Sequence, residues 1–292
     1  MSVMVLSPED VDRLLHDTTA STRIDMTNKI ASAYTQGANL SPQESKVAEQ
    51  IFRLLLRDTE VNVRISLAQQ LKDSNLIPHD IIKSLAKDVE EVSLPILEFS
   101  EVLTDEDLSE LIQATEQVSR YLAISRRRVV SETISDTLLA KGNDQVAASL
   151  VDNSGAILSE ASYEKIITTY KSNESMMQAL TKRPYLPVTV VDKLVHHVSA
   201  SLADSLKKKY KNSAGHIDKE VEKTREKETL HLIRVAQADT EIDSLIAQLR
   251  SSGRLTPSII LSALCQGDFN FFETSLAHLS HIPLSNARKL IT

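Results

Sequence analysis

Glycine and aromatic residues are scarce in this chain. Its 292 residues include only six Gly and no Trp, and aromatic residues make up 4% of the sequence. β-Sandwiches and β-barrels rely on Gly-rich turns and on aromatic strand residues. The scarcity of both argues against an all-β fold, while 41% hydrophobic and 25% charged residues are typical of a folded, soluble chain.

Other absences restrict the setting. The single cysteine, Cys265, cannot form an internal disulfide, and no run approaches the length of a membrane span. The first ten residues lack the charged and apolar regions of a secretory signal. We therefore expect a cytoplasmic protein without a membrane segment. The net charge of −7 argues against neutralisation of phosphate along the whole chain.

Motifs that carry chemistry are also missing. The sequence has no phosphate-binding Gly-rich loop, no Gly-x-Ser-x-Gly and no His-Glu-x-x-His. We expect no catalytic residue, no bound cofactor and no metal site. Glu228 and His231 share a helix face, but a di-iron bundle needs that pairing twice, so a surface pair is favoured. Cys265 lies in an apolar stretch and is expected to be a buried structural thiol.

Helical patterns fill the rest of the sequence. All six glycines fall where an apolar pattern of helical spacing stops, and most prolines come just before such a pattern starts. Ser41 and Glu44 form a predicted capping box. Val47, Ile51 and Leu54 recur at the spacing of one helix face. The sequence predicts an all-α chain of about a dozen or more helices, with Pro95 expected to kink or break its helix.

A short signature recurs along the chain: an apolar residue, then Pro, Thr or Ser, then an apolar helix. Neighbouring copies lie about 26 to 28 residues apart, or about twice that, which is typical of stacked helical hairpins. The expected fold is an α-solenoid, a superhelix of short hairpin repeats. The alternative is a non-repetitive helical bundle in which helix starts recur by chance. The copies begin at Leu76, Val102, Ile157, Tyr185, Arg254 and His281.

Breaks in this rhythm suggest three regions. Residues 1–186 hold the N-terminal helices and repeats, 187–250 a pair of long helices, and 251–292 a C-terminal repeat. The two long helices meet in a densely charged hairpin, residues 207–228, that could serve as an arm for dimerisation. The last helix stops without a C-cap, so we expect the natural chain to continue or a partner to cover it. Phe269, Phe271 and Phe272 are either core residues, which is favoured, or an exposed anchor.

Two resemblances support a repeat fold. The first is to the second helix of HEAT repeats, in which an aspartate and an arginine tie adjacent repeats together; it is carried by Asp58, Val63, Arg64, Leu67, Ala68 and Leu71. The second is to a bacterial family known as domain of unknown function 2336, typical of alphaproteobacteria. It implies HEAT-like helical repeats over roughly residues 40 to 290 and supplies no catalytic residues. Its most specific part is the stretch 85–108, which includes Pro95, Leu103, Thr104 and Leu108.

Charge is the remaining indication of a site. Ten acidic residues and no Lys or Arg lie between Asp88 and Glu116, and three consecutive arginines follow. Several of the acidic residues complement helix N-termini, and the others could form an acidic strip. The arginines either bridge adjacent repeats or form a docking patch. The residues expected to bind a partner are Arg126, Arg127, Arg128, Glu98, Glu101, Asp105 and Glu106.

Two functions fit this pattern. The favoured one is a non-enzymatic scaffold or regulatory adaptor that binds another protein through surface side chains. The alternative is a HEAT-like protein that binds nucleic acid through local basic patches, the arginine run and Lys207–Lys211. Against it stand the negative net charge and the few aromatic residues for base stacking.

Overall fold

The chain is divided into two compact units, Met1–Ser159 and Glu160–Thr292. The computed structural model describes residues 19–35, 40–184, 186–197, 214–236 and 239–291. These residues form α-helices joined by short connections and include no β-strand, only an isolated bridge between Val130 and Ala156. The predicted all-α class is therefore confirmed. None of the described helices combines the length and the apolar character that a bilayer crossing requires.

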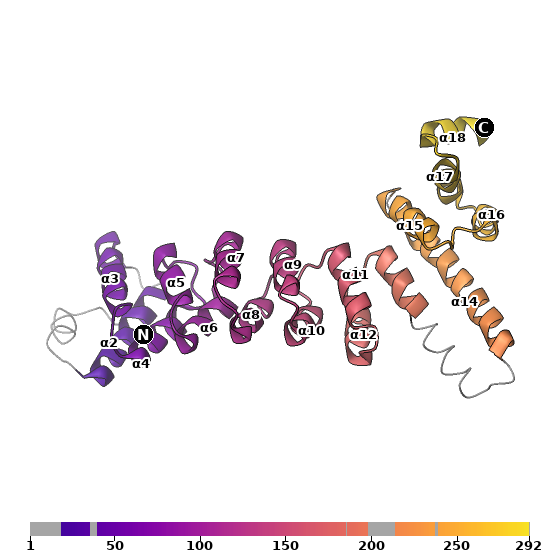
Figure 1. Ribbon diagram of the computed structural model, residues 1–292. Helices are drawn as coiled ribbons and strands as arrows, with labels where there is room; N and C mark the ends of the chain where they lie inside the picture. The colour runs from indigo at the N-terminus through magenta and orange to yellow at the C-terminus, as the bar shows by residue number, and fades with distance from the viewer. Residues whose placement is uncertain (1–18, 36–39, 185, 198–213, 237–238, 292) are drawn as a thin grey trace, which may run out of the picture. The chain divides into compact units, whose positions relative to one another are not determined.

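The first unit is built from helix pairs. Each of the pairs α3–α4, α5–α6, α7–α8 and α9–α10 is in contact, and the even-numbered helices also contact one another in series, from α2 to α10 (Figure 1). We call α2, α4, α6, α8 and α10 the even row. The helices of this unit are α2 (Ala20–Thr35), α3 (Pro42–Leu55), α4 (Val61–Leu71), α5 (His79–Ala86), α6 (Glu90–Phe99), α7 (Asp105–Gln113), α8 (Val118–Ser125), α9 (Glu132–Ala140) and α10 (Asp144–Asp152).

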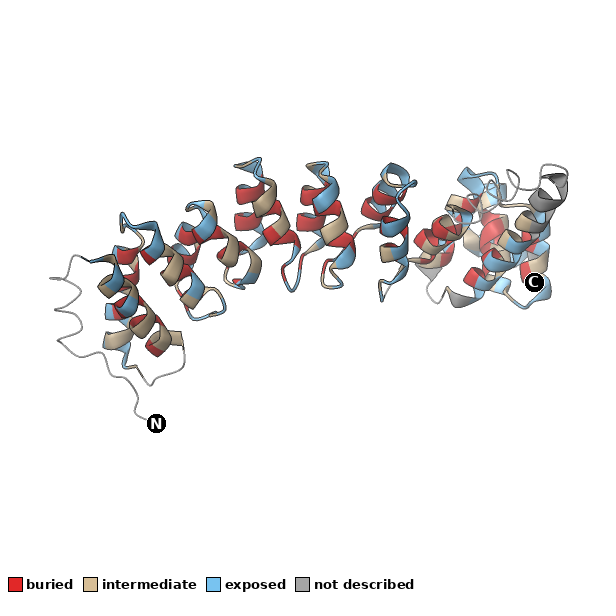
Figure 2. Ribbon diagram, turned by 90° about the horizontal axis from the view of Figure 1, so that it is seen from below, coloured by how far each residue is buried: buried red, intermediate tan, exposed pale blue. Residues whose placement is uncertain are grey.

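Each helix of this unit buries one face (Figure 2). The stripe predicted for α4, Val63, Leu67 and Leu71, is fully buried. For α3 the predicted face was partly wrong, because Leu54 is 63% exposed while Phe52 is fully buried. Phe52 lies on the buried face instead, where its ring packs edge-to-face against that of Tyr34 in α2.

Helix ends follow the expected capping rules. The backbone N–H of Ser41 donates to the Glu44 carboxylate at 2.7 Å, and the N–H of Glu44 donates to the Ser41 hydroxyl at 3.3 Å, as in a capping box. Pro95, in contrast, does not break α6, which continues to Phe99. Its ring lies at a half-buried position, where the carbonyl that loses its partner can turn toward solvent.

Ion pairs tie successive helix pairs together. Arg23 of α2 contacts Asp58 at 2.7 Å, and Arg64 of α4 contacts Asp88 at the same distance. Arg64 also donates to the backbone carbonyl of Asp58 at 2.6 Å. All of these side chains are largely buried. The aspartate and arginine of the HEAT-like pattern therefore join neighbouring pairs, as that resemblance implies.

The second unit has its own apolar core, formed mainly by leucine and isoleucine and including the buried ring of Phe271. The side chain of Asp192 is buried and receives hydrogen bonds from Arg254 at 2.7 and 3.0 Å. A helix described from 188 to 197 carries this aspartate. The labelled helices are α11 (Glu160–Thr169), α12 (Glu174–Thr181), α14 (Ala214–Val235), α15 (Asp239–Ser251), α16 (Pro257–Cys265), α17 (Phe269–Ser280) and α18 (Leu284–Ile291).

Two predictions for this unit are corrected. Phe271 is buried as expected, but Phe269 at the start of α17 is 62% exposed. Cys265 is exposed rather than buried, because it is the last residue of α16 and faces away from the core. The lysine run of the predicted charged hairpin, within residues 198–213, lies outside the described residues.

Candidate functional site

Helix α10 supplies one side of the candidate site. The side chain of Asn143 accepts hydrogen bonds from the backbone N–H groups of Gln145 and Val146 at 3.0 and 3.1 Å, and so begins the helix. Val146 faces the core, whereas Gln145 and Asp152 are exposed and Ser149 is half-buried. The side of α10 that carries Ser149 lies against α8, its neighbour in the even row.

Polar groups fix α10 to α8. The hydroxyls of Ser125 and Ser149 form a hydrogen bond of 2.7 Å. The amide nitrogen of Asn153 donates to the carbonyls of Ser125 and Arg127, both at 2.8 Å. These bonds satisfy the carbonyl of Ser125, at the C-terminal end of α8, and that of Arg127 in the connection that follows. The relative position of the two helices is thereby set.

The connections that follow these helices also meet. The backbone of Val130 accepts a hydrogen bond from Ile157 and donates to Gly155, at 2.9 and 3.1 Å. A Cβ atom on Gly155 would lie 2.0 Å from the carbonyl oxygen of Arg128. Only glycine permits so close an approach of two backbones. Gly155 therefore allows the connection that follows α10 to pack directly against the connection that follows α8.

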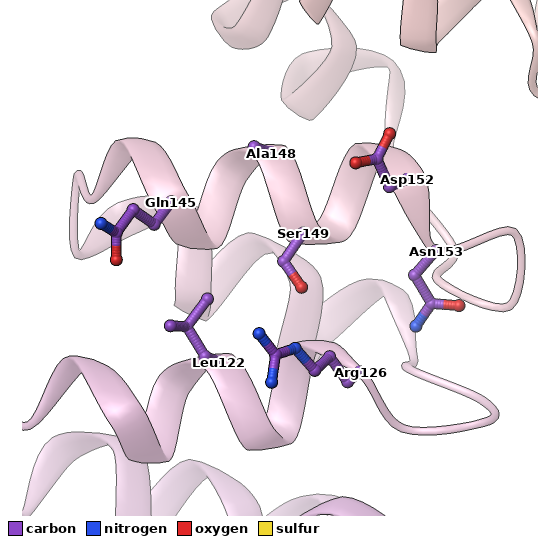
Figure 3. A pocket seen from close by; sticks show the side chains of 7 residues that line it. All are labelled: Leu122, Arg126, Gln145, Ala148, Ser149, Asp152 and Asn153. Carbon is purple, nitrogen blue, oxygen red and sulfur yellow. The ribbon is translucent and has the colours of Figure 1, made fainter.

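A groove of about 670 Å³ lies between α8 and α10, and Figure 3 shows it from close by. The two helices run in the same direction, and the Arg126 side chain extends from the end of α8 toward the space between them. Among the residues that the structure describes, no carboxylate forms an ion pair with Arg126. The groove is lined by Leu122, Arg126, Gln145, Ala148, Ser149, Asp152 and Asn153.

The three predicted arginines have different environments. Arg126 is exposed and lines the groove. Arg127 is only 8% exposed and donates to the carbonyls of Leu97 and Ser100 at 2.8 and 2.7 Å. Burial lowers the pKa of Arg127 from its ordinary value. The side chain of Arg128 is 87% exposed and lies 3.5 Å from a carboxylate oxygen. Arg127 is therefore a structural link to α6, the first of the two roles expected for these arginines, while partner binding by Arg126 and Arg128 stays a prediction.

The four predicted acidic residues lie near the connection between α6 and α7. Glu98 is half-buried at the end of α6, while Glu101, Asp105 and Glu106 are exposed. Glu101 is the carboxylate that faces Arg128. Hydrogen bonds from its own backbone and from the Thr104 side chain lower the pKa of Glu106. None of the four lines the groove, so the structure does not bring the predicted acidic residues and Arg126 into one site.

Two carboxylates of the longer acidic run, Asp107 and Glu110, pair with bases that lie earlier in the chain, in and just after α5. Lys83 of α5 contacts Asp107 at 2.7 Å and Glu110 at 2.9 Å. Lys87 contacts Glu110 at 2.7 Å, and the ring of His79 lies 2.5 Å from Asp107. These pairs were not predicted from the sequence, because each base lies more than twenty residues before the carboxylate that it contacts. The feature of the sequence that could have indicated them is the four-residue spacing of His79, Lys83 and Lys87, which puts all three on one face of a helix.

The groove residues other than Arg126 were also missed. Gln145 and Ser149 occur in an unremarkable helical stretch, and only the position of α10 beside α8 makes them part of a site. Among the described residues, no three His, Cys, Asp or Glu side chains converge as metal ligands. The ring of His278 lies 3.2 Å from a carboxylate oxygen of Asp243.

A family model described as "Uncharacterised protein conserved in bacteria (DUF2336)" matches residues 92–292, well over half of the chain. The match includes both sides of the groove. No curated protein and no solved structure matches this sequence.

Proposed function

Because this chain belongs to the uncharacterised bacterial family DUF2336, we propose a function from its own residues: a non-enzymatic scaffold or adaptor that binds another protein. The groove between α8 and α10, with the unpaired cation of Arg126 in it, is the observation that supports this best. An open groove on helices, lined by apolar, amide and charged side chains, suits a segment of a partner protein.

The fold proposed for this role is an α-solenoid of short HEAT-like repeats. The contacts of each even-row helix with the next support it, as does the repeated aspartate–arginine tie. Stacked hairpins of this kind offer a long surface whose specificity depends on surface side chains. The proposed place of action is the cytoplasm.

Nucleic-acid binding by local basic patches is the weaker candidate. Of the three arginines that suggested it, Arg127 is buried and bound to carbonyls. Of this run, Arg126 and Arg128 remain as exposed charges in a chain of net charge −7, and the lysine run that also suggested this function lies outside the described residues. Phosphate binding is strongest where several cations track a backbone, and two charges on different surfaces do not provide this.

Site-specific photocrosslinking in the bacterium that makes the protein tests the scaffold proposal. A benzophenone amino acid would replace Gln145, which is exposed in the groove, or Thr133, which is exposed on α9. We expect discrete crosslinked protein bands, identified by mass spectrometry, from position 145 and not from position 133. Identical products at both positions, or crosslinks to nucleic acid alone, would contradict the proposal.

A further inference from the structure

An inventory of hydrogen-bonding groups shows which parts of the groove are available to a ligand. Ser149 is engaged with Ser125, and Asn153 uses its amide to hold two carbonyls of the neighbouring connection. Its oxygen accepts from the N–H of Gly155 at 2.9 Å. These side chains therefore serve the structure. Arg126 and Gln145 remain as donors that face the groove and form no such link.

The guanidinium of Arg126 is well suited to one particular group. It presents N–H donors in a fixed fork that matches the two oxygens of a carboxylate. Leu122 contributes apolar surface beside it, and Ala148 and Gln145 line the groove from α10 (Figure 3). This arrangement fits an acidic side chain followed by apolar contact, as a short peptide segment provides.

Asp152 restricts the ligand further. Its carboxylate lies on the rim of the same groove, at the end of α10, and Figure 3 places it across the helix from Arg126. A polyanion laid along the groove would meet this negative charge, whereas a single carboxylate directed at Arg126 would not. The groove also has no aromatic side chain on which a base could stack. Both features favour a peptide over a nucleic acid.

We infer that this groove binds an acidic peptide segment of the partner protein, with one Asp or Glu side chain paired to Arg126. The inference rests on the proposed scaffold function and adds the chemistry of its ligand. The pair is partly open to water, so it contributes specificity and a modest share of the affinity.

Selection from a phage library of random dodecapeptides on the full chain tests this assignment. Peptides that bind would be synthesised with each Asp or Glu unchanged or replaced by its amide, and measured against three proteins by fluorescence anisotropy. These proteins are the wild type, Arg126→Gln and Arg128→Gln. The last variant is the matched control, because it removes the same charge from an exposed arginine outside the groove.

We expect one carboxylate of the peptide to matter about tenfold for binding to the wild type. Arg126→Gln should remove that difference, and Arg128→Gln should preserve it. Peptides that bind without depending on a carboxylate, or equally well to Arg126→Gln, would overturn the inference and leave the scaffold proposal intact. A library that yields no binder would count against both.

Two other ligands of the groove would give different results with the same proteins. If light scattering showed self-association that Arg126→Gln abolishes, the ligand would be a second copy of this chain and the partner assignment would be wrong. If a labelled single-stranded oligonucleotide displaced the peptide and lost affinity in Arg126→Gln, the groove would be a nucleic-acid site.

Discussion

Three consecutive arginines in different environments allow a sharp stability comparison. Replacing Arg127 with Met removes the donors to the carbonyls of Leu97 and Ser100, at 2.8 and 2.7 Å. Each bond from a charged donor contributes about 1.5–3 kcal/mol, and losing both leaves buried acceptors without a partner. The change also removes a buried charge, whose burial lowers the pKa of Arg127. Removing that charge offsets part of the loss in stability. We expect a net loss of about 3 kcal/mol in the free energy of unfolding.

The neighbouring arginines serve as controls for this experiment. Arg126→Met and Arg128→Met change exposed side chains and should stay within about 0.5 kcal/mol of the wild type. Urea unfolding followed by circular dichroism measures all three variants. Hydrogen exchange of peptides from α6 and α8 locates the effect, because Arg127 joins the ends of these helices. If Arg127→Met matched the two controls, the structural role assigned to this arginine would be refuted.

Three further predictions concern single contacts. Gly155→Ala places a Cβ 2.0 Å from a backbone oxygen, so we expect a loss of about 2 kcal/mol or more, seen as a lower melting temperature. Burial raises the pKa of Asp107, but hydrogen bonds, led by that from Lys83, outweigh it and hold the pKa well below its ordinary value. Its contribution is therefore present above the unfolded pKa and is lost as the pH falls below about 4, and Asp107→Asn should flatten the dependence of unfolding free energy on pH in acid. Arg254→Met leaves Asp192 charged and buried without its main partner, so we expect a loss of about 3 kcal/mol by urea unfolding, partly recovered when Asp192→Asn is added.

Local signals made the helices predictable. Glycine just past a helix end, proline or serine at a start, and apolar residues at helical spacing all act within a few residues of one another. The capping box at Ser41 and the buried stripe on α4 followed directly. The errors at Leu54 and Cys265 have one physical cause: which face of a helix is buried depends on neighbouring helices, and these are distant in sequence.

The site was less predictable for the same reason. The arginine run was visible, but the role of each member depends on carbonyls and carboxylates about 27 residues or more earlier, such as those of Leu97 and Glu101. A run of like charges suggests one patch, whereas a helix end turns successive side chains in different directions. Arg127 turns inward, and Arg126 and Arg128 are left on separate surfaces.

Charge pairing between helix pairs determines which charges on the surface of the first unit are already neutralised within the chain. Lys83 and Lys87 neutralise carboxylates that would otherwise attract basic partners, and Arg64 does the same for Asp88. Arg126, in contrast, lines an open groove and forms no ion pair with any described carboxylate. A charge that the chain leaves unpaired in a groove gains most from an incoming ion of opposite sign. For that reason the ligand proposed for the groove carries an acidic side chain, although the chain as a whole is acidic.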